Sequence, residues 1–353
     1  MTQQSTQQST QQSTQLVDAC GRPITYMRVS VTDRCNFRCV YCMPAEGIEL
    51  KRHSDMLTME EIARVVRVAA GMGITKVRIT GGEPLARKGV VSLVRQVAAI
   101  EGIRDIALTT NGTVLEGYAQ ELAAAGLKRV NVSLDTLRPE TFAELTRGGD
   151  LGAVLRGIAA AERAGLCPVK INTVVLKGIN SDEIESMAAL TLEHPWDVRF
   201  IEFMPFWGNG GVYGEEHVVP IDEVRRRVMA MGAEAQPGAT PEPVKAGAGP
   251  AMDAGPAAYV RLRGAKGRVG FISREGDEFC VRCNRIRLTA DGMFRPCLLS
   301  DATIDVKCAL RGGADDAAIA DIIRQAVAAK PESGAIRGAD GNWKAQPLVR
   351  IGG

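Results

Sequence analysis

The chain has 353 residues, a formal charge of +2 and 45% hydrophobic residues. This length allows one barrel-sized domain or two to three ordinary domains, with enough apolar residues for a sizeable core. No apolar stretch reaches the roughly 18 residues that a membrane helix needs, and 43 Lys and Arg against 41 Asp and Glu argue against nucleic-acid binding through a basic surface.

The first 19 residues are predicted to be a disordered tail. Residues 2–15 contain only Thr, Gln and Ser, which cannot bury enough surface to fold. The tract also lacks the successive basic and apolar regions of an export signal, so we expect a cytoplasmic protein. In that reducing compartment, cysteine clusters bind metals more often than they form disulfides.

Short β-branched runs alternate with helical patterns from residue 20 to residue 231. The runs predict buried parallel strands over Tyr26–Thr32, Lys76–Thr80, Asp105–Thr110, Arg129–Leu134, Val169–Leu176 and Val198–Phe203. The helices are expected over Thr58–Gly71, Gly89–Ile100, Val114–Ala125, Leu151–Ala164, Ser181–Leu192 and Ile221–Met231. Six such units imply a parallel sheet, either doubly wound or curled into a partial barrel.

The composition changes after residue 231. Residues 232–257 are dominated by Gly, Ala and Pro, which predicts a long loop. Residues 258–353 form a smaller second region, for which we expect two short strands, a hairpin and a helix. These elements are predicted at Tyr259–Arg263, Arg268–Ser273, the Asp291-Gly292 turn and Asp315–Ala329.

Three of the nine cysteines lie close together directly after the first strand. Cys35, Cys39 and Cys42 can each bind one iron of a four-iron cluster and leave the fourth iron open to another ligand. A zinc knuckle is the alternative, although zinc usually needs a fourth ligand nearby. The spacing favours iron–sulfur.

Three further cysteines lie in the second region. Cys280, Cys283 and Cys297 fit either a second open iron–sulfur cluster or a zinc site completed by Cys308. The spacing alone does not decide between these two. Cys20, Cys167 and Cys308 have no assigned role and are expected to be ordinary thiols.

The first cysteine loop resembles that of the radical S-adenosylmethionine (SAM) enzymes. An aromatic residue, Tyr41, precedes the last cysteine, and Gly81-Gly82-Glu83-Pro84 at the end of the second strand is similar to the family's SAM-contacting segment. Further segments resemble the GTP 3′,8-cyclase family of molybdenum-cofactor biosynthesis. They are Thr109–Gly112, Asn131–Asp135, Val169–Val175, Phe200–Pro205, Phe279–Gly292 and the terminal Gly352-Gly353.

This resemblance implies an α/β fold, a partial (βα)6 TIM-like barrel followed by a C-terminal α+β region with the second cluster. It implies two 4Fe-4S clusters and SAM as cofactors. A 5′-deoxyadenosyl radical would abstract H3′ of GTP, after which C3′ attacks C8 to give (8S)-3′,8-cyclo-7,8-dihydroguanosine 5′-triphosphate.

The resemblance also implies roles for individual residues. SAM would be contacted by Tyr41, Gly82, Ser133 and Met204; core packing is the other interpretation for Met204, and a strand-end cap for Ser133. GTP would be contacted by Arg28, Arg78, Thr109, Lys170, Arg285, Ile286 and Arg287, with Lys76 and Arg199 as weaker candidates. Arg285, Arg287, Gly352 and Gly353 would assist catalysis, although Arg285 and Arg287 also fit an exposed hairpin strand.

Three kinds of partner are expected: GTP, an external electron donor, and a downstream cyclic pyranopterin monophosphate synthase. No nucleic-acid or membrane partner is expected. The sequence does not decide whether the protein forms a homodimer. Two rival functions remain at this point. A radical SAM enzyme that modifies a peptide would explain both cysteine groups, and a non-catalytic zinc module would hold two zinc ions and no iron.

Overall fold

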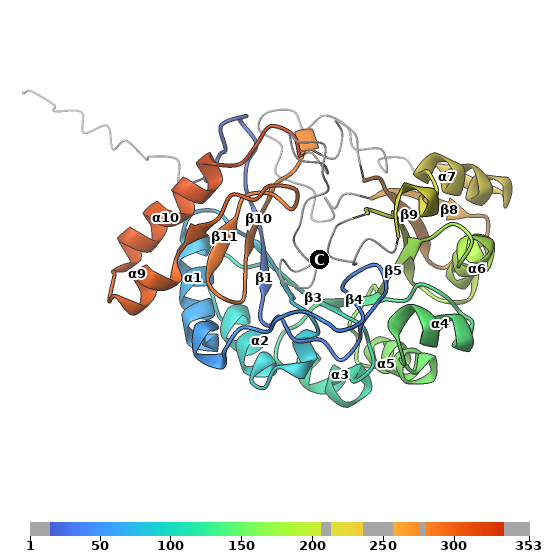
Figure 1. Cartoon of the computed structure of the whole chain (residues 1–353), viewed down its shortest axis with the longest axis horizontal. Helices are drawn as coiled ribbons and strands as arrows, with labels where there is room; N and C mark the ends of the chain where they lie inside the picture. The colour runs from blue at the N-terminus through green and yellow to red at the C-terminus, as the bar shows by residue number, and fades with distance from the viewer. Residues whose placement is uncertain (1–14, 206–212, 236–256, 275–279, 335–353) are drawn as a thin grey trace, which may run out of the picture.

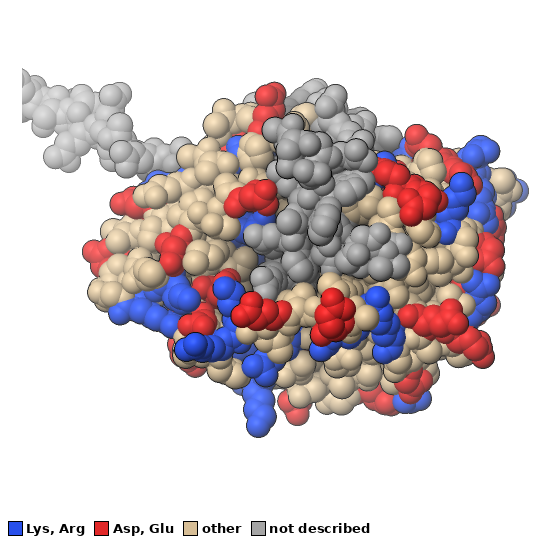
Figure 2. Space-filling view, viewed as in Figure 1, with Lys and Arg blue, Asp and Glu red and all other residues tan. Residues whose placement is uncertain are grey.

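The fold is taken from a computed structural model of the chain. It describes residues 15–205, 213–235, 257–274 and 280–334. Within these residues, no helix is both long enough and apolar enough to cross a lipid bilayer. Acidic and basic side chains are interspersed over the face of the molecule shown in Figure 2.

Six parallel strands form the centre of the molecule, as the sequence predicts. They are β1 (Tyr26–Ser30), β2 (Lys76–Thr80), β3 (Asp105–Thr110), β4 (Arg129–Ser133), β5 (Lys170–Val175) and β6 (Asp197–Glu202). The α-helices that follow them are α1 (Met59–Gly71), α2 (Val90–Ala98), α3 (Leu115–Ala124), α4 (Pro139–Thr146), α5 (Leu151–Arg163), α6 (Ile184–Glu193) and α7 (Ile221–Ala230). Figure 1 shows the strands as a curved sheet with these helices on its convex side.

The C-terminal strands continue this sheet at both edges. They are β7 (Ala233–Ala235), β8 (Ala258–Leu262), β9 (Arg268–Ile272), β10 (Arg285–Leu288), β11 (Met293–Arg295) and β12 (Ile304–Asp305). The strand order is β12-β11-β10-β1-β2-β3-β4-β5-β6-β9-β8-β7, with β10 parallel to β1 and β9 parallel to β6. The partial barrel is confirmed, and the second region extends its sheet.

Side chains alternate along each strand between the two faces of the sheet. On β1, Met27 and Val29 are fully buried in the core that the sheet forms with the helices. Arg28 and Ser30 therefore face the concave interior. The same alternation on the neighbouring strands lines this interior with polar and charged residues.

The helices begin and end where the residues dictate. Thr58 and Glu61 form the predicted capping box at the start of α1. The Asp291-Gly292 turn joins β10 to β11, and Asp315 caps α10 (Asp316–Ala328).

The sequence did not predict α4 or the short α9 (Lys307–Arg311). Short 3-10 turns cover His53–Asp55, Pro84–Ala86, Ser181–Glu183 and Glu215–His217.

Two segments differ from the sequence-based boundaries. Residues 16–19, expected in the disordered tail, belong to the fold because Leu16 is buried in the core and Asp18 pairs with Arg22. Ala233–Ala235, expected in the loop, form β7 because they pair with β8. Most of the predicted Gly/Ala/Pro loop and the terminal Gly352 and Gly353 lie outside the described residues.

Candidate functional site

The first cysteine loop follows β1 at the C-terminal end of the parallel strands, where barrel enzymes hold their active sites. Cys35, Cys39 and Cys42 are close enough to affect one another's ionisation. Among the described residues, no three His, Cys, Asp or Glu side chains are grouped to hold a single metal ion. A four-iron cluster does not need such a group, because each thiolate binds a different iron.

The loop is held in place from the helical side of the barrel. Arg147, at the end of α4, donates to the carbonyl oxygens of Arg38 (2.7 Å) and Met43 (3.0 Å). Phe37 packs edge-on against Phe142 of α4, with ring centroids 5.9 Å apart. Sequence reasoning missed Arg147 and α4, and neither carries a motif that would have revealed this role.

Acidic groups act on the thiols of the first loop. Burial raises the pKa of Cys39 well above its ordinary value, and the neighbouring Cys42, Asp135 and Cys35 raise it further. Burial likewise raises the pKa of Asp135 to about 6, although hydrogen bonds from Tyr41 and Val174 oppose this. The Tyr41 hydroxyl donates to Asp135 Oδ2 over 2.7 Å, so a side-chain contact with SAM would have to share or replace this bond.

The predicted SAM-contacting segment lies directly beside the cysteine loop. The amide of Gly82 donates to Thr32 O and that of Glu83 to Arg34 O, both over 2.8 Å. Gly81 has a φ of +152°, and a Cβ there would lie 2.6 Å from Thr32 O. Glycine is therefore required at this position for the two segments to approach so closely.

Glu83 connects this segment to the end of β3. Its buried carboxylate accepts hydrogen bonds from the amides of Leu85 (2.9 Å) and Asn111 (2.7 Å) and from the Thr110 hydroxyl (2.8 Å). Burial raises the pKa of Glu83 to about 7, although these hydrogen bonds act to lower it. The side-chain nitrogen of Asn111, Nδ2, also lies 3.9 Å from Cys35 Sγ.

A pocket brings the second group of cysteines together. Its described lining includes Cys280, Cys283 and Cys297, with the cations Arg285 and Lys330. Cys308 is exposed on α9, hydrogen-bonded to Asp305, and is absent from the described lining. Three of the four cysteines of the alternative zinc site therefore share this pocket, and the fourth, Cys308, is absent from its described lining.

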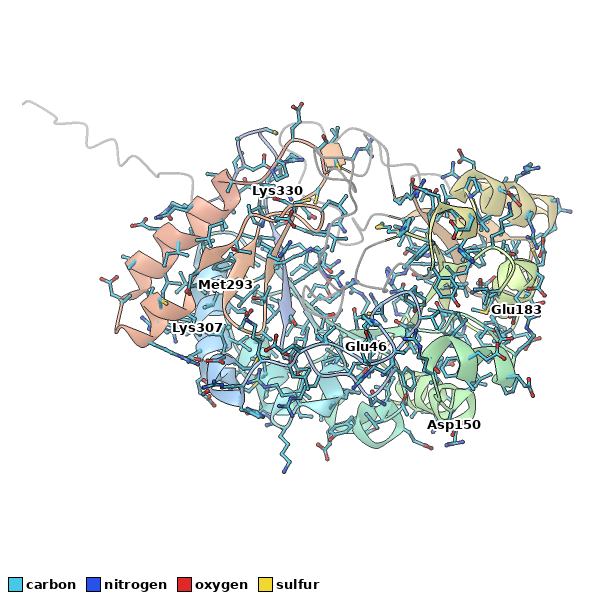
Figure 3. The ribbon with its side chains drawn as sticks, in the orientation of Figure 1. Glu46, Asp150, Glu183, Met293, Lys307 and Lys330 are labelled. Carbon is cyan, nitrogen blue, oxygen red and sulfur yellow. The ribbon has the colours of Figure 1, made fainter. Side chains whose placement is uncertain are left out.

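Lys330 joins the two chain segments that carry these cysteines. Its buried ammonium group donates to the carbonyl oxygens of Arg285 and Pro296, each over 3.0 Å, and lies 3.4 Å from Cys283 Sγ. Figure 3 labels Lys330 just beyond α10. Burial raises the pKa of Cys283, but Arg285 and Lys330 lower it to about 6 overall.

Arg22 fixes the same pocket from the N-terminal side. Its guanidinium donates to Asp18 Oδ2 (2.6 Å) and to the carbonyl oxygens of Cys280 (2.8 Å), Pro331 (2.6 Å) and Glu332 (2.8 Å). Sequence reasoning missed Arg22 and Lys330. A single charged residue outside a motif gives no sign of such long-range contacts.

The predicted GTP-binding cations line the interior between the two cysteine sites. Arg287, Arg28 and Arg78 are in register on β10, β1 and β2 and form one row across three strands. Asn131, with its amide oxygen directed toward them, accepts from Arg78 of β2 and, over 3.0 Å, from Arg199 of β6. Strands so far apart in the sheet can share one acceptor only across its concave side.

Acidic residues balance part of this charge at the bottom of the barrel. Lys170 lies 3.5 Å from Asp197, which also pairs with Arg268. Lys76 pairs with Asp105 over 3.1 Å. The Thr109 hydroxyl and the Nε of Arg78 are buried without a hydrogen-bond partner in the described part of the chain. Such groups are available to a polar ligand.

Three predicted contacts have distinct positions. Ser133, in register with Asn172 of β5, is half-buried on the interior side of β4. Met204 packs with Leu299 and Cys297 near the second pocket. The Ile286 side chain lies in the helix-facing core, so only its main chain could contact a nucleotide. Arg285 and Arg287 face the interior. Because Arg287 is buried, the exposed-hairpin interpretation is excluded for this residue.

Two family descriptions match successive parts of the chain. Residues 29–191 match the Radical SAM superfamily, and residues 196–336 match Molybdenum Cofactor Synthesis C. The boundary between them falls before β6. Together they span nearly all of the described residues.

Similar proteins agree with these matches. A GTP 3′,8-cyclase of Pelotomaculum thermopropionicum is 51% identical over 315 residues, covering 89% of this chain and 94% of that protein. A GTP 3′,8-cyclase of Peptoclostridium acidaminophilum is 46% identical over 338 residues, covering 96% of this chain and 98% of that protein. Streptococcus suis SuiB bound to S-adenosylmethionine has a similar fold, with a TM-score of 0.57 and 15% identity over 92% of this chain and 76% of that one.

Proposed function

The chain belongs to the GTP 3′,8-cyclase family of radical SAM enzymes, and from this premise we propose which of its residues perform the reaction. The enzyme carries 4Fe-4S clusters and uses SAM. It converts GTP to (8S)-3′,8-cyclo-7,8-dihydroguanosine 5′-triphosphate, in the first step of molybdopterin biosynthesis. A peptide-modifying or zinc-binding function is not supported by relatives of this identity and coverage.

The first cysteine loop holds the cluster that SAM approaches. Cys35, Cys39 and Cys42 would hold this cluster, which would supply an open iron and an electron for the cleavage of SAM. Tyr41, Gly82 and Ser133 contact SAM, which is supported by the hydrogen bonds between the Gly82 segment and the loop. Met204, beside Leu299, contacts SAM from the side of the second pocket.

The second pocket holds the other cluster and the base of GTP. Cys280, Cys283 and Cys297 would hold this cluster, which would supply an open iron as a ligand for the guanine. Arg285, Arg287 and the main chain of Ile286 contact the nucleotide, and the two arginines assist catalysis. This assignment is supported by the shared pocket of the three cysteines and both arginines.

The triphosphate binds to the cations of the barrel interior. Arg28, Arg78 and Lys170 contact its phosphates, and Thr109 donates a hydrogen bond from a hydroxyl that is otherwise unpartnered in the described chain. Arginine forms bidentate contacts with phosphate, and lysine acts as a point charge. The single observation that carries this proposal is the row Arg287–Arg28–Arg78 between the two cysteine sites.

An anaerobic assay with SAM, dithionite and GTP tests the function. We expect 5′-deoxyadenosine to form together with the cyclised nucleotide, and both to depend on GTP. SAM cleavage that is the same with and without GTP would point to another substrate. Anaerobic iron and sulfide analysis should find two four-iron clusters per chain, whereas zinc alone would refute the cofactor assignment.

Gly352 and Gly353 are proposed to reach the active site and assist catalysis, by resemblance to the family's terminal segment. Deleting both residues should abolish turnover while iron and sulfide contents stay unchanged. Normal turnover by the shortened chain would refute this role.

The remaining partners follow from the chemistry. The reaction needs an external one-electron donor, and we propose that the product is handed to a downstream cyclic pyranopterin monophosphate synthase. We further propose a cytoplasmic location, where iron–sulfur clusters and SAM are supplied. The homodimer that the sequence leaves open is tested by light scattering of the anaerobic protein.

A further inference from the structure

Tyr26 lies deeper in the barrel interior than the row Arg287–Arg28–Arg78. It is the first residue of β1, two positions before Arg28 and on the same face of the strand. Its neighbours in register are Arg285 on β10 and Lys76 on β2. The side chain is 3% exposed.

The hydroxyl of Tyr26 is buried and has no hydrogen-bond partner in the described part of the chain. Leaving a buried hydroxyl unpaired destabilises a protein, and such groups usually have a protein, water or ligand partner. The hydroxyl therefore marks a position at which a hydrogen-bonding ligand fits.

The surroundings of this hydroxyl indicate the charge of that ligand. Lys76 Nζ lies 5.2 Å and Arg78 Cζ 5.6 Å from the centroid of the Tyr26 ring. Burial raises the pKa of Tyr26, but Arg78, Arg28, Lys76 and Arg285 lower it to about 8 overall. The one acidic group on β3, two strands away from β1, is Asp105, which pairs with Lys76 and Arg129. The net surroundings favour an anion.

We propose that Tyr26 is a further ligand of the GTP triphosphate, its hydroxyl donating a hydrogen bond to a phosphate oxygen at the base of the barrel. This inference rests on the proposed function. Tyr26 is about 6–7 Å further along β1 from the first cysteine loop than Arg28, at roughly 3.3 Å per residue. As a phosphate ligand the hydroxyl touches neither C3′ nor C8 of GTP, so it contributes to GTP binding and leaves the chemical step unchanged.

Tyr26→Phe in the enzyme with both clusters is the direct test. The variant keeps the ring beneath Lys76 and Arg78 and removes only the hydroxyl. A hydrogen bond to a charged group is worth about 1.5–3 kcal/mol, so the KM for GTP should rise by roughly ten- to a hundredfold. The kcat and the KM for SAM should stay unchanged. Tyr118→Phe, on the helical α3, is the matched control and should match wild type.

Absorbance titration of tyrosine gives a second readout that does not depend on turnover. Without ligand, one tyrosine should ionise near pH 8, and Tyr26→Phe should lack this transition. Inorganic triphosphate should move the midpoint to higher pH, because a bound anion disfavours the phenolate.

The outcomes separate the two hypotheses. If wild type converts GTP, a Tyr26→Phe KM equal to that of wild type overturns the role of Tyr26, whatever the titration shows. If wild type does not convert GTP, the proposed function fails and the titration alone decides: a midpoint that triphosphate does not move overturns Tyr26 as an anion ligand.

Discussion

The two three-cysteine sites have opposite electrostatic surroundings. At the first site, burial and the neighbouring acid Asp135 raise the pKa of Cys39, and the carboxylate of Glu83 acts on Cys35 in the same direction. At the second site, Arg285 and Lys330 lower the pKa of Cys283 to about 6. Three cysteines are thus placed beside acidic groups once and beside basic groups once.

This difference sorts the two ligands by charge. SAM has a net positive charge, because its sulfonium and ammonium groups outweigh its one carboxylate, and acidic surroundings attract it, whereas GTP is a polyanion, which the arginines attract. Each molecule is therefore disfavoured at the other's site. The near-neutral total charge of the chain does not reveal this separation, because it sums 43 Lys and Arg and 41 Asp and Glu over the whole sequence.

Removing one cysteine from each site is the strongest test of this division. Cys42→Ala should abolish SAM cleavage and leave one cluster, because the iron that SAM approaches is lost. Cys297→Ala should also leave one cluster but retain slow SAM cleavage without GTP cyclisation. Iron analysis and 5′-deoxyadenosine formation measure these effects. Loss of SAM cleavage in both variants, with one cluster remaining in each, would contradict separate roles.

Removing one cation from the interior row should affect only the anionic ligand. Arg287→Gln is expected to raise the KM for GTP at least thirtyfold, since truncating a buried charged contact costs about 2–5 kcal/mol. The KM for SAM should not change. Arg226→Gln, an exposed residue of α7, is the control. An equal rise in both KM values for Arg287→Gln would show that the row does not discriminate.

Lys330→Met should weaken the second cluster and leave the first intact. Changes to groups that support metal ligands reduce metal affinity by about 10–100-fold, so a chelator should remove the second cluster at least tenfold faster. The rate is measured in a Cys39→Ala background, where the signal comes from one cluster. Lys330→Arg keeps the charge and should lie near wild type. Equal rates for all three proteins would argue against the role of Lys330.

Glu83→Gln is expected to have the smallest effect, on the pH dependence of stability. Burial raises the pKa of Glu83 to about 7, above its value in the unfolded chain. Unfolded Glu83 therefore ionises at a lower pH than folded Glu83. As a result, the free energy of unfolding falls as pH rises from about 5 and stops falling above about pH 7. Between pH 6 and 8 the loss is about 1.4 kcal/mol, or roughly 2 °C in Tm for a chain of this length.

The variant should lack this component, so its Tm should fall less than that of wild type over the same range. Parallel Tm curves would show that Glu83 is ionised throughout. The first site would then carry a negative charge at pH 6 as well as at pH 8, which sharpens the contrast with the second site.

Local patterns predicted the six β/α units and both cysteine groups. They did so because strand periodicity, helix caps and metal-ligand spacing are short-range properties. The row Arg287–Arg28–Arg78 could not be predicted, because it depends on the register between strands from opposite ends of the chain. Arg22, Arg147 and Lys330 were missed for the same reason: their hydrogen bonds reach main-chain atoms far away in the sequence.

The pairing of β1 with β10 has a consequence for how the protein is made. β1 is among the first strands to leave the ribosome, and β10 among the last. At about 5–20 residues per second, β1 waits roughly ten to fifty seconds with one edge unpaired. During this time the nascent barrel exposes an edge that can associate with other chains. Chaperone protection should therefore matter most until β10 emerges, directly after the second cysteine pair, and covers this edge.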